Sequence, residues 1–163
     1  MDEAPFVYAT DVVRVFPDYA GSVIWFSEPL PYPETRLMPD LIALLQDWEG
    51  QYYAALDDDL HWRASVSLQD FSTRGLELAR AVSVELDPRL AVEYRSFEDP
   101  KAIARLRSEH PATNPAAEAA FLDRADRARA EWAETRASQA ARPDITPGWY
   151  ARSPRSGAIF RPR

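Results

Sequence analysis

The 163-residue chain contains no cysteine, and this absence excludes several kinds of chemistry. Disulfides, thiolate zinc sites, iron–sulfur clusters and thiol nucleophiles all need cysteine. Glycine is also scarce, with five residues, and the sequence has no glycine-rich loop of the kind that binds phosphates or dinucleotides. Catalysis would have to use carboxylates, hydroxyls, arginine or the two histidines, His61 and His110. We therefore expect a non-catalytic protein without cofactor or metal.

Long apolar runs are missing as well. No stretch approaches the roughly 18 to 20 apolar residues of a membrane span. The N-terminal sequence MDEAPFVYAT is acidic, whereas a secretory signal begins with positive charge. We expect a soluble, cytoplasmic protein with no membrane partner. Its length and its 46% hydrophobic content suffice for one ordinary core and are short for two.

Positive charge is scarce in the first part of the chain. Residues 1–100 carry 19 Asp and Glu against 7 Lys and Arg, a balance of −12. Residues 101–163 carry 7 Asp and Glu against 12 Lys and Arg, a balance of +5. Either the basic part folds back onto the acidic part, or each binds a partner of opposite charge. Arginine makes up 18 of the 19 basic residues, and a GC-rich genome explains this bias more simply than a binding site does.

Short β-branched and aromatic runs predict the strands. Residues 12–16 and 22–26 flank PDYAG, whose proline, aspartate and glycine favour a turn, so they predict an antiparallel pair. Four prolines within residues 28–39 favour an extended loop. Residues 90–95, LAVEYR, predict a third strand by alternation.

Two helices are predicted over residues 40–56 and 67–86, where apolar residues recur at steps of three and four. Ser67 is placed to cap the second helix. Gly75 lies on the apolar face of that helix and costs about 1 kcal/mol relative to alanine. Its presence indicates close packing against a neighbouring element. The apolar face of the first helix comprises Leu41, Leu44, Leu45, Trp48, Tyr52 and Leu56.

The predicted order is ββααβ, an α+β domain in which two helices pack on one face of a small antiparallel sheet. We expect three regions: an acidic α+β domain at residues 1–100, a helical appendage at 101–140, and a basic docking arm or tail at 141–163.

The appendage is expected to contain two helical pieces. Residues 101–110 predict two helical turns. Asn114 as N-cap and Pro115 at the first helical position predict the start of a long helix that ends near residue 140. Its narrow apolar seam would dock on the domain or on another chain, which allows self-association. The seam consists of Phe121, Ala125, Ala128 and Trp132.

Three consecutive aspartates, Asp57, Asp58 and Asp59, stand just before His61 and Trp62. Asp57 and His61 are four residues apart, and a carboxylate with an imidazole can bind a divalent metal or transfer a proton. However, the apolar helix pattern ends before the aspartates, and three adjacent negative charges repel one another within a helix. We therefore expect a solvated turn between the helices. An acidic patch that faces a partner is the second interpretation, and a metal or catalytic site is the third.

The end of the chain, residues 142–163, contains four prolines and five arginines but no periodicity that could form its own core. The large apolar residues that it nevertheless contains favour an extended docking arm over a disordered tail. Arginines beside aromatics also suit nucleic-acid binding. The same residues suit docking on the acidic domain of the chain itself, and we favour this docking over nucleic-acid binding. The candidate binding residues of this arm are Trp149, Tyr150, Arg152, Arg155 and Phe160.

One stretch of the chain is similar to small bacterial proteins of immunity type, many from GC-rich genomes, that occur near polymorphic toxins. The resemblance covers about residues 20–96. Its elements are a strand with Trp25, a proline-bearing loop at 29–33, a helix with central Trp48, an acidic turn with Trp62, a helix with GLELA at 75–79, and a V-x-Y strand at 92–94.

The resemblance implies a protein that inhibits by binding. An acidic surface with aromatic residues would cover the basic substrate groove of a toxin, often a nuclease, and electrostatic attraction would speed association. On this reading Asp57, Asp58, Asp59 and Trp62 contact the partner. The alternative is a structural or assembly subunit of a phage or secretion-like particle, in which the C-terminal helix and arm clamp neighbouring chains. An enzyme with an unrecognised site is the third hypothesis.

Overall fold

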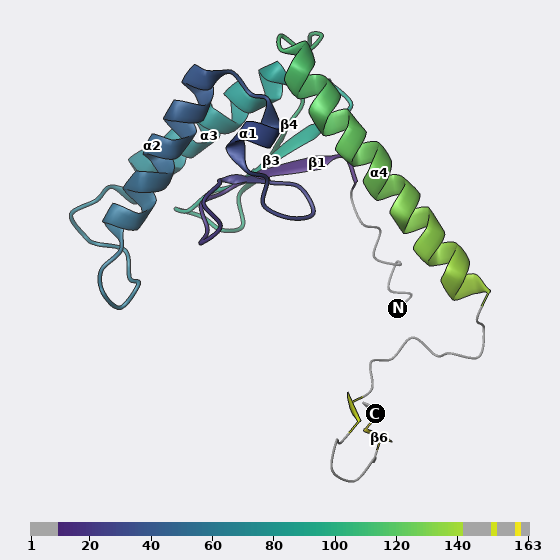
Figure 1. Ribbon diagram of the computed structural model, residues 1–163. Helices are drawn as coiled ribbons and strands as arrows, with labels where there is room; N and C mark the ends of the chain where they lie inside the picture. Colours follow the sequence, from purple (N-terminus) through teal and green to yellow (C-terminus); the bar gives the residue numbers. More distant parts are fainter. Residues whose placement is uncertain (1–9, 142–150, 153–158, 161–163) are drawn as a thin grey trace. The chain divides into compact units, whose positions relative to one another are not determined.

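The computed structural model describes residues 10–141, 151–152 and 159–160, and the chain divides into two compact units, Met1–Ala128 and Arg129–Arg163. Figure 1 shows the elements along the chain. The helices are α1 (Tyr32–Thr35), α2 (Pro39–Ala55), α3 (Leu68–Glu85) and α4 (Pro115–Ala140). The strands are β1 (Val12–Val15), β2 (Ile24–Trp25), β3 (Ala91–Arg95), β4 (Ile103–Leu106), β5 (Ala151–Arg152) and β6 (Ile159–Phe160).

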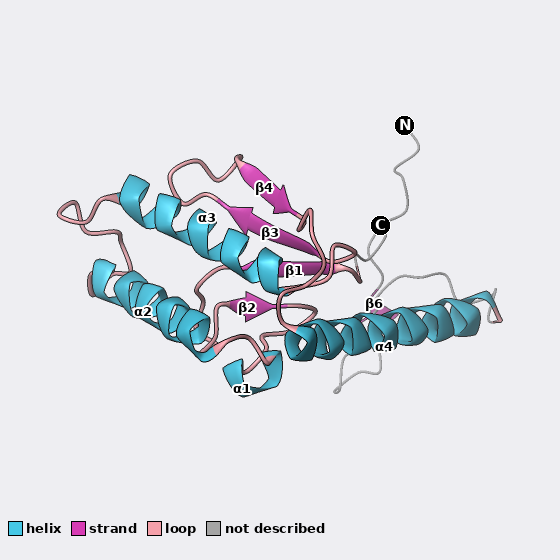
Figure 2. Cartoon of the chain, turned by 90° about the horizontal axis from the view of Figure 1, so that it is seen from above, coloured by secondary structure: helices cyan, strands magenta, loops and turns pink. Residues whose placement is uncertain are grey.

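The first four strands form one mixed sheet in the order β2-β1-β3-β4 (Figure 2). β1 and β2 pair antiparallel as predicted, with Arg14 opposite Trp25. β3 pairs antiparallel with β4 but parallel with β1. The prediction of an entirely antiparallel sheet is therefore wrong for the β1–β3 pair. The chain leaves β1 and β2, passes through two helices and re-enters the sheet beside β1, and a helical crossover of this kind allows parallel pairing.

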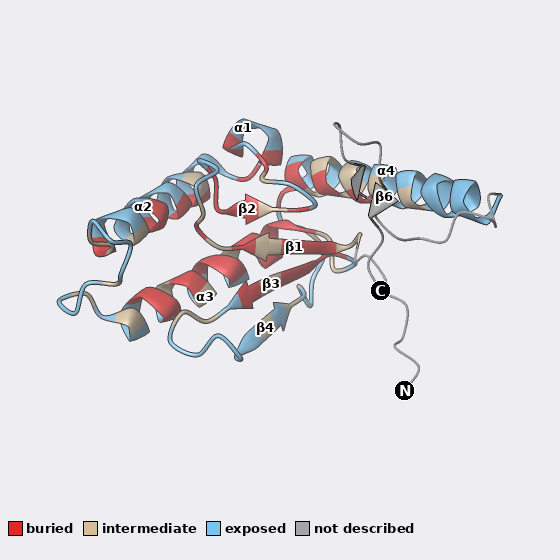
Figure 3. Cartoon of the chain, turned by 90° about the horizontal axis from the view of Figure 1, so that it is seen from below, coloured by how far each residue is buried: buried red, intermediate tan, exposed pale blue. Residues whose placement is uncertain are grey.

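α2 and α3 lie together on one face of the sheet, which confirms the α+β class and the two-layer arrangement (Figure 2). Alternate strand residues point into the layer between sheet and helices. Val13, Val15 and Val92 are fully buried there, as is Trp48 of α2. Figure 3 shows that burial is concentrated on the inner sides of these elements.

The buried face of α2 is narrower than predicted. Leu41, Leu45 and Trp48 are buried, but Leu44 is 45% exposed. Because the buried face is centred on Leu45 and Trp48, Leu44 lies on its flank and reaches solvent. The prediction that Leu44 belongs to the core is wrong.

Gly75 of α3 allows a close contact between this helix and its neighbours in the core. A Cβ atom at this position would lie 2.5 Å from Cζ2 of Trp48 and 2.6 Å from Oη of Tyr94. The close packing predicted for Gly75 is therefore confirmed. The N-cap of the same helix is confirmed too, since Oγ of Ser67 accepts a hydrogen bond from the N–H of Asp70 (3.1 Å).

Two segments differ from their predictions. Residues 103–106 form strand β4, not a helical turn, because they pair with the otherwise open edge of β3. Arg105 also donates to Glu93 on that strand (2.9 Å). In the proline-rich segment, Tyr32–Thr35 forms the short helix α1, with Pro33 in its first turn, where a proline is tolerated.

The start of α4 is part of the core of the first unit. Asn114 caps the helix as predicted, since its Oδ1 accepts from the N–H of Ala117 (3.1 Å). Its Nδ2 donates to the carbonyl oxygen of Arg36 (2.9 Å) and to Oε2 of Glu85 (2.8 Å). Phe121 is fully buried in the same hydrophobic cluster as Trp48 and the sheet valines. The first turns of α4 are therefore fastened to the sheet-and-helix domain by both polar and apolar contacts.

In the second unit, β5 and β6 form a two-stranded antiparallel sheet, with Ala151 opposite Phe160 and Arg152 opposite Ile159.

Candidate protein-binding site

The three aspartates lie in the loop between α2 and α3, which confirms the predicted turn. The side chain of Asp57 stabilises the turn by hydrogen bonds to its backbone. Its carboxylate accepts hydrogen bonds from the backbone N–H groups of His61 (2.8 Å) and Asp59 (3.0 Å). The bond from His61 is the largest cause that holds the pKa of Asp57 below its usual value. Asp57 therefore has a structural task in addition to its charge.

Asp58, Asp59 and Leu60 form the exposed tip of the turn. Leu60 has φ +63° and is 62% exposed, so the left-handed backbone presents an apolar side chain beside two carboxylates. Below the tip, the N–H of Arg63 donates to the carbonyl oxygen of Ala55 (2.8 Å), which closes the loop. These hydrogen bonds fix the backbone on both sides of the tip.

His61 does not combine with the aspartates in a metal site. Its Nδ1 lies 3.9 Å from Oδ1 of Asp57, and its side chain is 79% exposed. In the part of the chain that the structure describes, no three side chains of the metal-ligating types come together.

Trp62 supports the turn from the edge of the core. Its ring is half-buried and contacts Phe71 at a centroid distance of 4.9 Å. Its Nε1 donates to the carbonyl oxygen of Val66 (3.0 Å). Most of this residue is therefore engaged within the protein, and only an edge can meet a partner.

Two tyrosines that the sequence analysis did not single out lie next to the turn. Tyr19 of the β1–β2 loop is 69% exposed, and Tyr53 near the end of α2 is 38% exposed. Their ring centroids are 6.1 Å apart, and Oη of Tyr53 donates to the carbonyl oxygen of Asp18 (2.6 Å). The signal in the sequence was weak: Tyr53 falls one position off the apolar stripe of its helix.

These exposed residues make one surface, which we call the acidic–aromatic patch. It draws on the β1–β2 loop, the last turn of α2 and the following loop, which lie at the same end of the domain (Figure 1). The patch consists of the half-buried Asp18 and the exposed Tyr19, Tyr53, Asp58, Asp59 and Leu60.

The predicted binding residues of the C-terminal arm belong to the last part of the chain, of which only residues 151–152 and 159–160 are described. Trp149, Tyr150 and Arg155 lie outside the described residues, and Arg152 and Phe160 belong to β5 and β6 of the second unit. A role for them in partner binding stays a prediction.

A buried carboxylate, Glu49 of α2, lies one helical turn before Tyr53 of the patch. It is 8% exposed, and its Oε2 accepts a hydrogen bond from Oη of Tyr32 (3.2 Å). Its Oε1 has no hydrogen-bond partner within the described part of the chain. Burial raises the pKa of Glu49 because the ionised form loses hydration.

Glu49 should therefore make the stability of the fold depend on pH. A raised native pKa favours folding below the unfolded-state pKa of about 4.3, and this contribution is lost as pH rises through the native pKa. The variant Glu49→Gln cannot ionise, so its stability relative to the wild type should increase from pH 4 to pH 8. Thermal unfolding across this range measures the difference. The exposed replacement Glu28→Gln is the control, and parallel pH profiles for Glu49→Gln and wild type would contradict the expectation.

None of the described helices combines the length and apolarity needed to cross a bilayer. Comparison with curated proteins and with solved structures gave no significant match. The family described as Serratia CdiI immunity protein-like matches residues 11–97, more than half of the chain. The matched range runs from the start of β1 to just beyond β3 and contains the acidic turn. This confirms the resemblance to immunity-type proteins of toxin systems. The chain belongs to the Serratia CdiI immunity protein-like family.

Proposed function

We propose that this protein inhibits a toxin by binding it, without catalysing a reaction itself. The family that matches the chain is described as immunity protein-like, and the match contains α2, α3 and the strands β1 to β3, together with the acidic–aromatic patch. The acidic turn is the main reason for choosing the acidic–aromatic patch as the toxin-binding surface. Asp58 and Asp59 are exposed at the tip of a loop whose base is fixed by hydrogen bonds.

The chemistry of the patch suits a basic partner. Carboxylates at a protruding tip attract a positively charged groove over a distance comparable to the Debye length and raise the association rate. Tyr19 and Tyr53 offer large apolar area with a polar end, which is typical of residues that dominate binding energy. Because Asp57 holds the loop from within, little conformational entropy is lost when the tip is covered.

The finer assignment gives each residue of the turn a role. Asp58 and Asp59 provide charge, and Leu60 with the two tyrosines provides apolar contact. Asp57 and Trp62 keep the loop in position, and their exposed edges complete the contact. The partner is then a basic protein, and the C-terminal arm adds further contacts to it.

Neutralising the tip should slow association with the toxin. The partner is captured from the native host with the full chain, identified by mass and purified. With the double variant Asp58→Asn/Asp59→Asn, we expect an association rate about tenfold lower at low ionic strength and a weaker dependence on salt. The dissociation rate should change much less. Stopped-flow or surface-based kinetics at several salt concentrations measure these quantities.

Asp57 is kept in this experiment because its carboxylate forms the turn. The matched control is Glu28→Gln/Glu109→Gln, which changes the net charge by the same amount at exposed positions away from the patch. Equal association rates for the two double variants would contradict the assignment of the patch.

A further inference from the structure

The sheet presents a second surface, on the face away from α2 and α3, whose charge is opposite to that of the acidic turn. Strand register places Trp25, Arg14, Glu93 and Arg105 in one row across β2, β1, β3 and β4. Their neighbours along the strands, such as Val15 and Val92, point to the helices and are fully buried. The row therefore belongs to the face that α2 and α3 leave uncovered (Figure 3).

Positive charge exceeds negative charge on this face. Glu93 is shared by two arginines: its Oε1 lies 3.4 Å from Nε of Arg14, and its Oε2 lies 2.9 Å from Nε of Arg105. Arg95 lies two residues further along β3 and points to the same side. It is exposed and forms no ion pair with any residue in the described ranges. Three guanidinium groups thus face one carboxylate, in a part of the chain that is otherwise strongly acidic.

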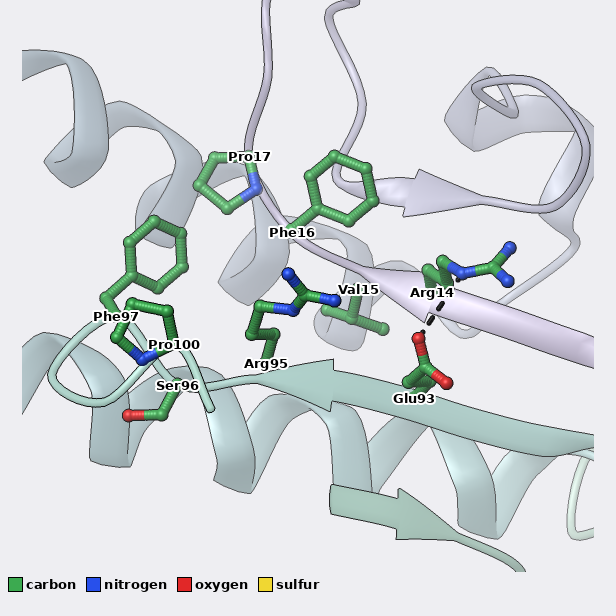
Figure 4. A pocket seen from close by; sticks show the side chains of 9 residues that line it. All are labelled: Arg14, Val15, Phe16, Pro17, Glu93, Arg95, Ser96, Phe97 and Pro100. Carbon is green, nitrogen blue, oxygen red and sulfur yellow. Dashed lines mark ion pairs between the residues drawn. The ribbon is translucent and has the colours of Figure 1, made fainter. Parts of the chain in front are cut away.

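A pocket of about 500 Å³ opens where β1 and β3 end (Figure 4). Its apolar walls are Phe16 and Pro17 after β1, and Phe97 and Pro100 after β3. Figure 4 shows the side chain of Arg95 between the two walls. The pocket therefore combines the guanidinium group of Arg95 with two apolar surfaces.

Both walls are held in place by the surrounding structure. The ring of Phe16 stacks on Trp25 at a centroid distance of 4.8 Å, and Nε1 of Trp25 donates to the carbonyl oxygen of Phe16 (3.1 Å). Phe97 packs edge-on against Phe71 at 5.1 Å, and its N–H donates to Oγ of Ser72 (2.7 Å). Because these walls are already fixed, a ligand would lose little binding free energy to the ordering of protein side chains.

We infer that this pocket binds a segment of a partner protein in which a carboxylate stands next to an aromatic or branched apolar side chain. The carboxylate would pair with Arg95, assisted by Arg14, and a charge-assisted bond of this kind is about twice as strong as a neutral one. The apolar side chain would lie between the two walls. A nucleic acid fits less well, because Glu93 and the net charge of −7 repel a phosphate backbone. The pocket adjoins the start of the β1–β2 loop, whose following residues Asp18 and Tyr19 belong to the acidic–aromatic patch. The inference nevertheless does not depend on the toxin-inhibitor proposal.

The test uses the full chain labelled with nitrogen-15 and two synthetic peptides. One is acetyl-Ala-Glu-Phe-Asp-Ala-amide, and the other is its uncharged counterpart, acetyl-Ala-Gln-Phe-Asn-Ala-amide. We expect the acidic peptide to cause saturable shifts of the backbone amides of residues 14–16 and 95–97. The uncharged peptide should bind at least about tenfold more weakly, because it lacks the charge-assisted bond.

Arg95→Gln should weaken binding of the acidic peptide by about the same factor. Arg80→Gln removes one positive charge from an exposed position on α3, which lies on the other face of the sheet, and should leave binding within about twofold. Equal binding of the two peptides to the wild type would overturn the inference, and this comparison does not depend on any variant folding.

Two further results would also overturn it. One is tighter binding of a ten-residue oligothymidine than of the acidic peptide at the same amides, which would make the pocket a nucleic-acid site. The other is self-association of the unlabelled chain in sedimentation that Arg95→Gln abolishes, which would make a second copy of the chain the occupant. Because no toxin is present in these experiments, their failure leaves the inhibitor proposal unaffected.

Discussion

Replacing Phe121 by alanine is expected to lower the free energy of unfolding by about 3–5 kcal/mol, the range found when a buried phenylalanine is truncated. Phe121 is fully buried and belongs to the same cluster as Trp48, although it lies beyond the family match at residues 11–97. Truncation would leave a cavity between α4 and the domain. Urea unfolding of the full chain measures the change in midpoint and slope.

The matched control is Leu44→Ala, which removes a large apolar side chain that is 45% exposed and should cost less than about 1 kcal/mol. An unfolding free energy for Phe121→Ala equal to that of Leu44→Ala would mean that α4 does not complete the core.

The same reasoning predicts that a chain ending at residue 100 loses its cooperative unfolding, since it lacks β4 and Phe121. A chain ending at residue 140 should keep it.

Replacing Gly75 by alanine is expected to destabilise the fold by about 2–3 kcal/mol, although alanine is the better helix former by about 1 kcal/mol. The added methyl group would lie 2.5 Å from Cζ2 of Trp48 and 2.6 Å from Oη of Tyr94. Both rings are buried, so neither can move aside into solvent. Relief of the clash requires α3 to shift away from the sheet and from α2.

Gly50 provides a control with the opposite sign. It lies on the exposed side of α2, and a Cβ atom there would meet no heavy atom within 4 Å. Gly50→Ala should therefore stabilise the protein by about 0.5–1 kcal/mol through helix propensity. If both variants gained stability, the close approach of α3 to Trp48 and Tyr94 would be contradicted.

Features that depend on local rules could be predicted from the sequence. Ser67 and Asn114 cap their helices because a side-chain oxygen three residues before a free N–H is sufficient for a cap. Gly75 could be predicted as a point of close packing because it stands on an apolar face where glycine is otherwise unfavourable. The turn at Asp57 followed from the end of the apolar pattern and from charge repulsion.

Features that depend on distant partners could not be predicted. β4 has the half-exposed pattern of an edge strand, and its hydrogen bonds come from β3, so its sequence alone does not distinguish it from a helical turn. The parallel pairing of β1 with β3 is a property of the crossover and not of either strand. Tyr19 and Tyr53 form a pair only because the β1–β2 loop reaches the end of α2. Likewise, Phe16 and Phe97 become two walls of one pocket only after the sheet has formed.

The most direct test of the inhibitor proposal is bacterial growth with the captured partner produced alone and together with the full chain. We predict that the partner alone arrests growth and that co-production of the chain restores it. Restoration should be weaker with Asp58→Asn/Asp59→Asn than with Glu28→Gln/Glu109→Gln, at equal amounts of folded protein. A partner that does not affect growth, or an arrest that persists although the two proteins form a complex, would contradict the proposal.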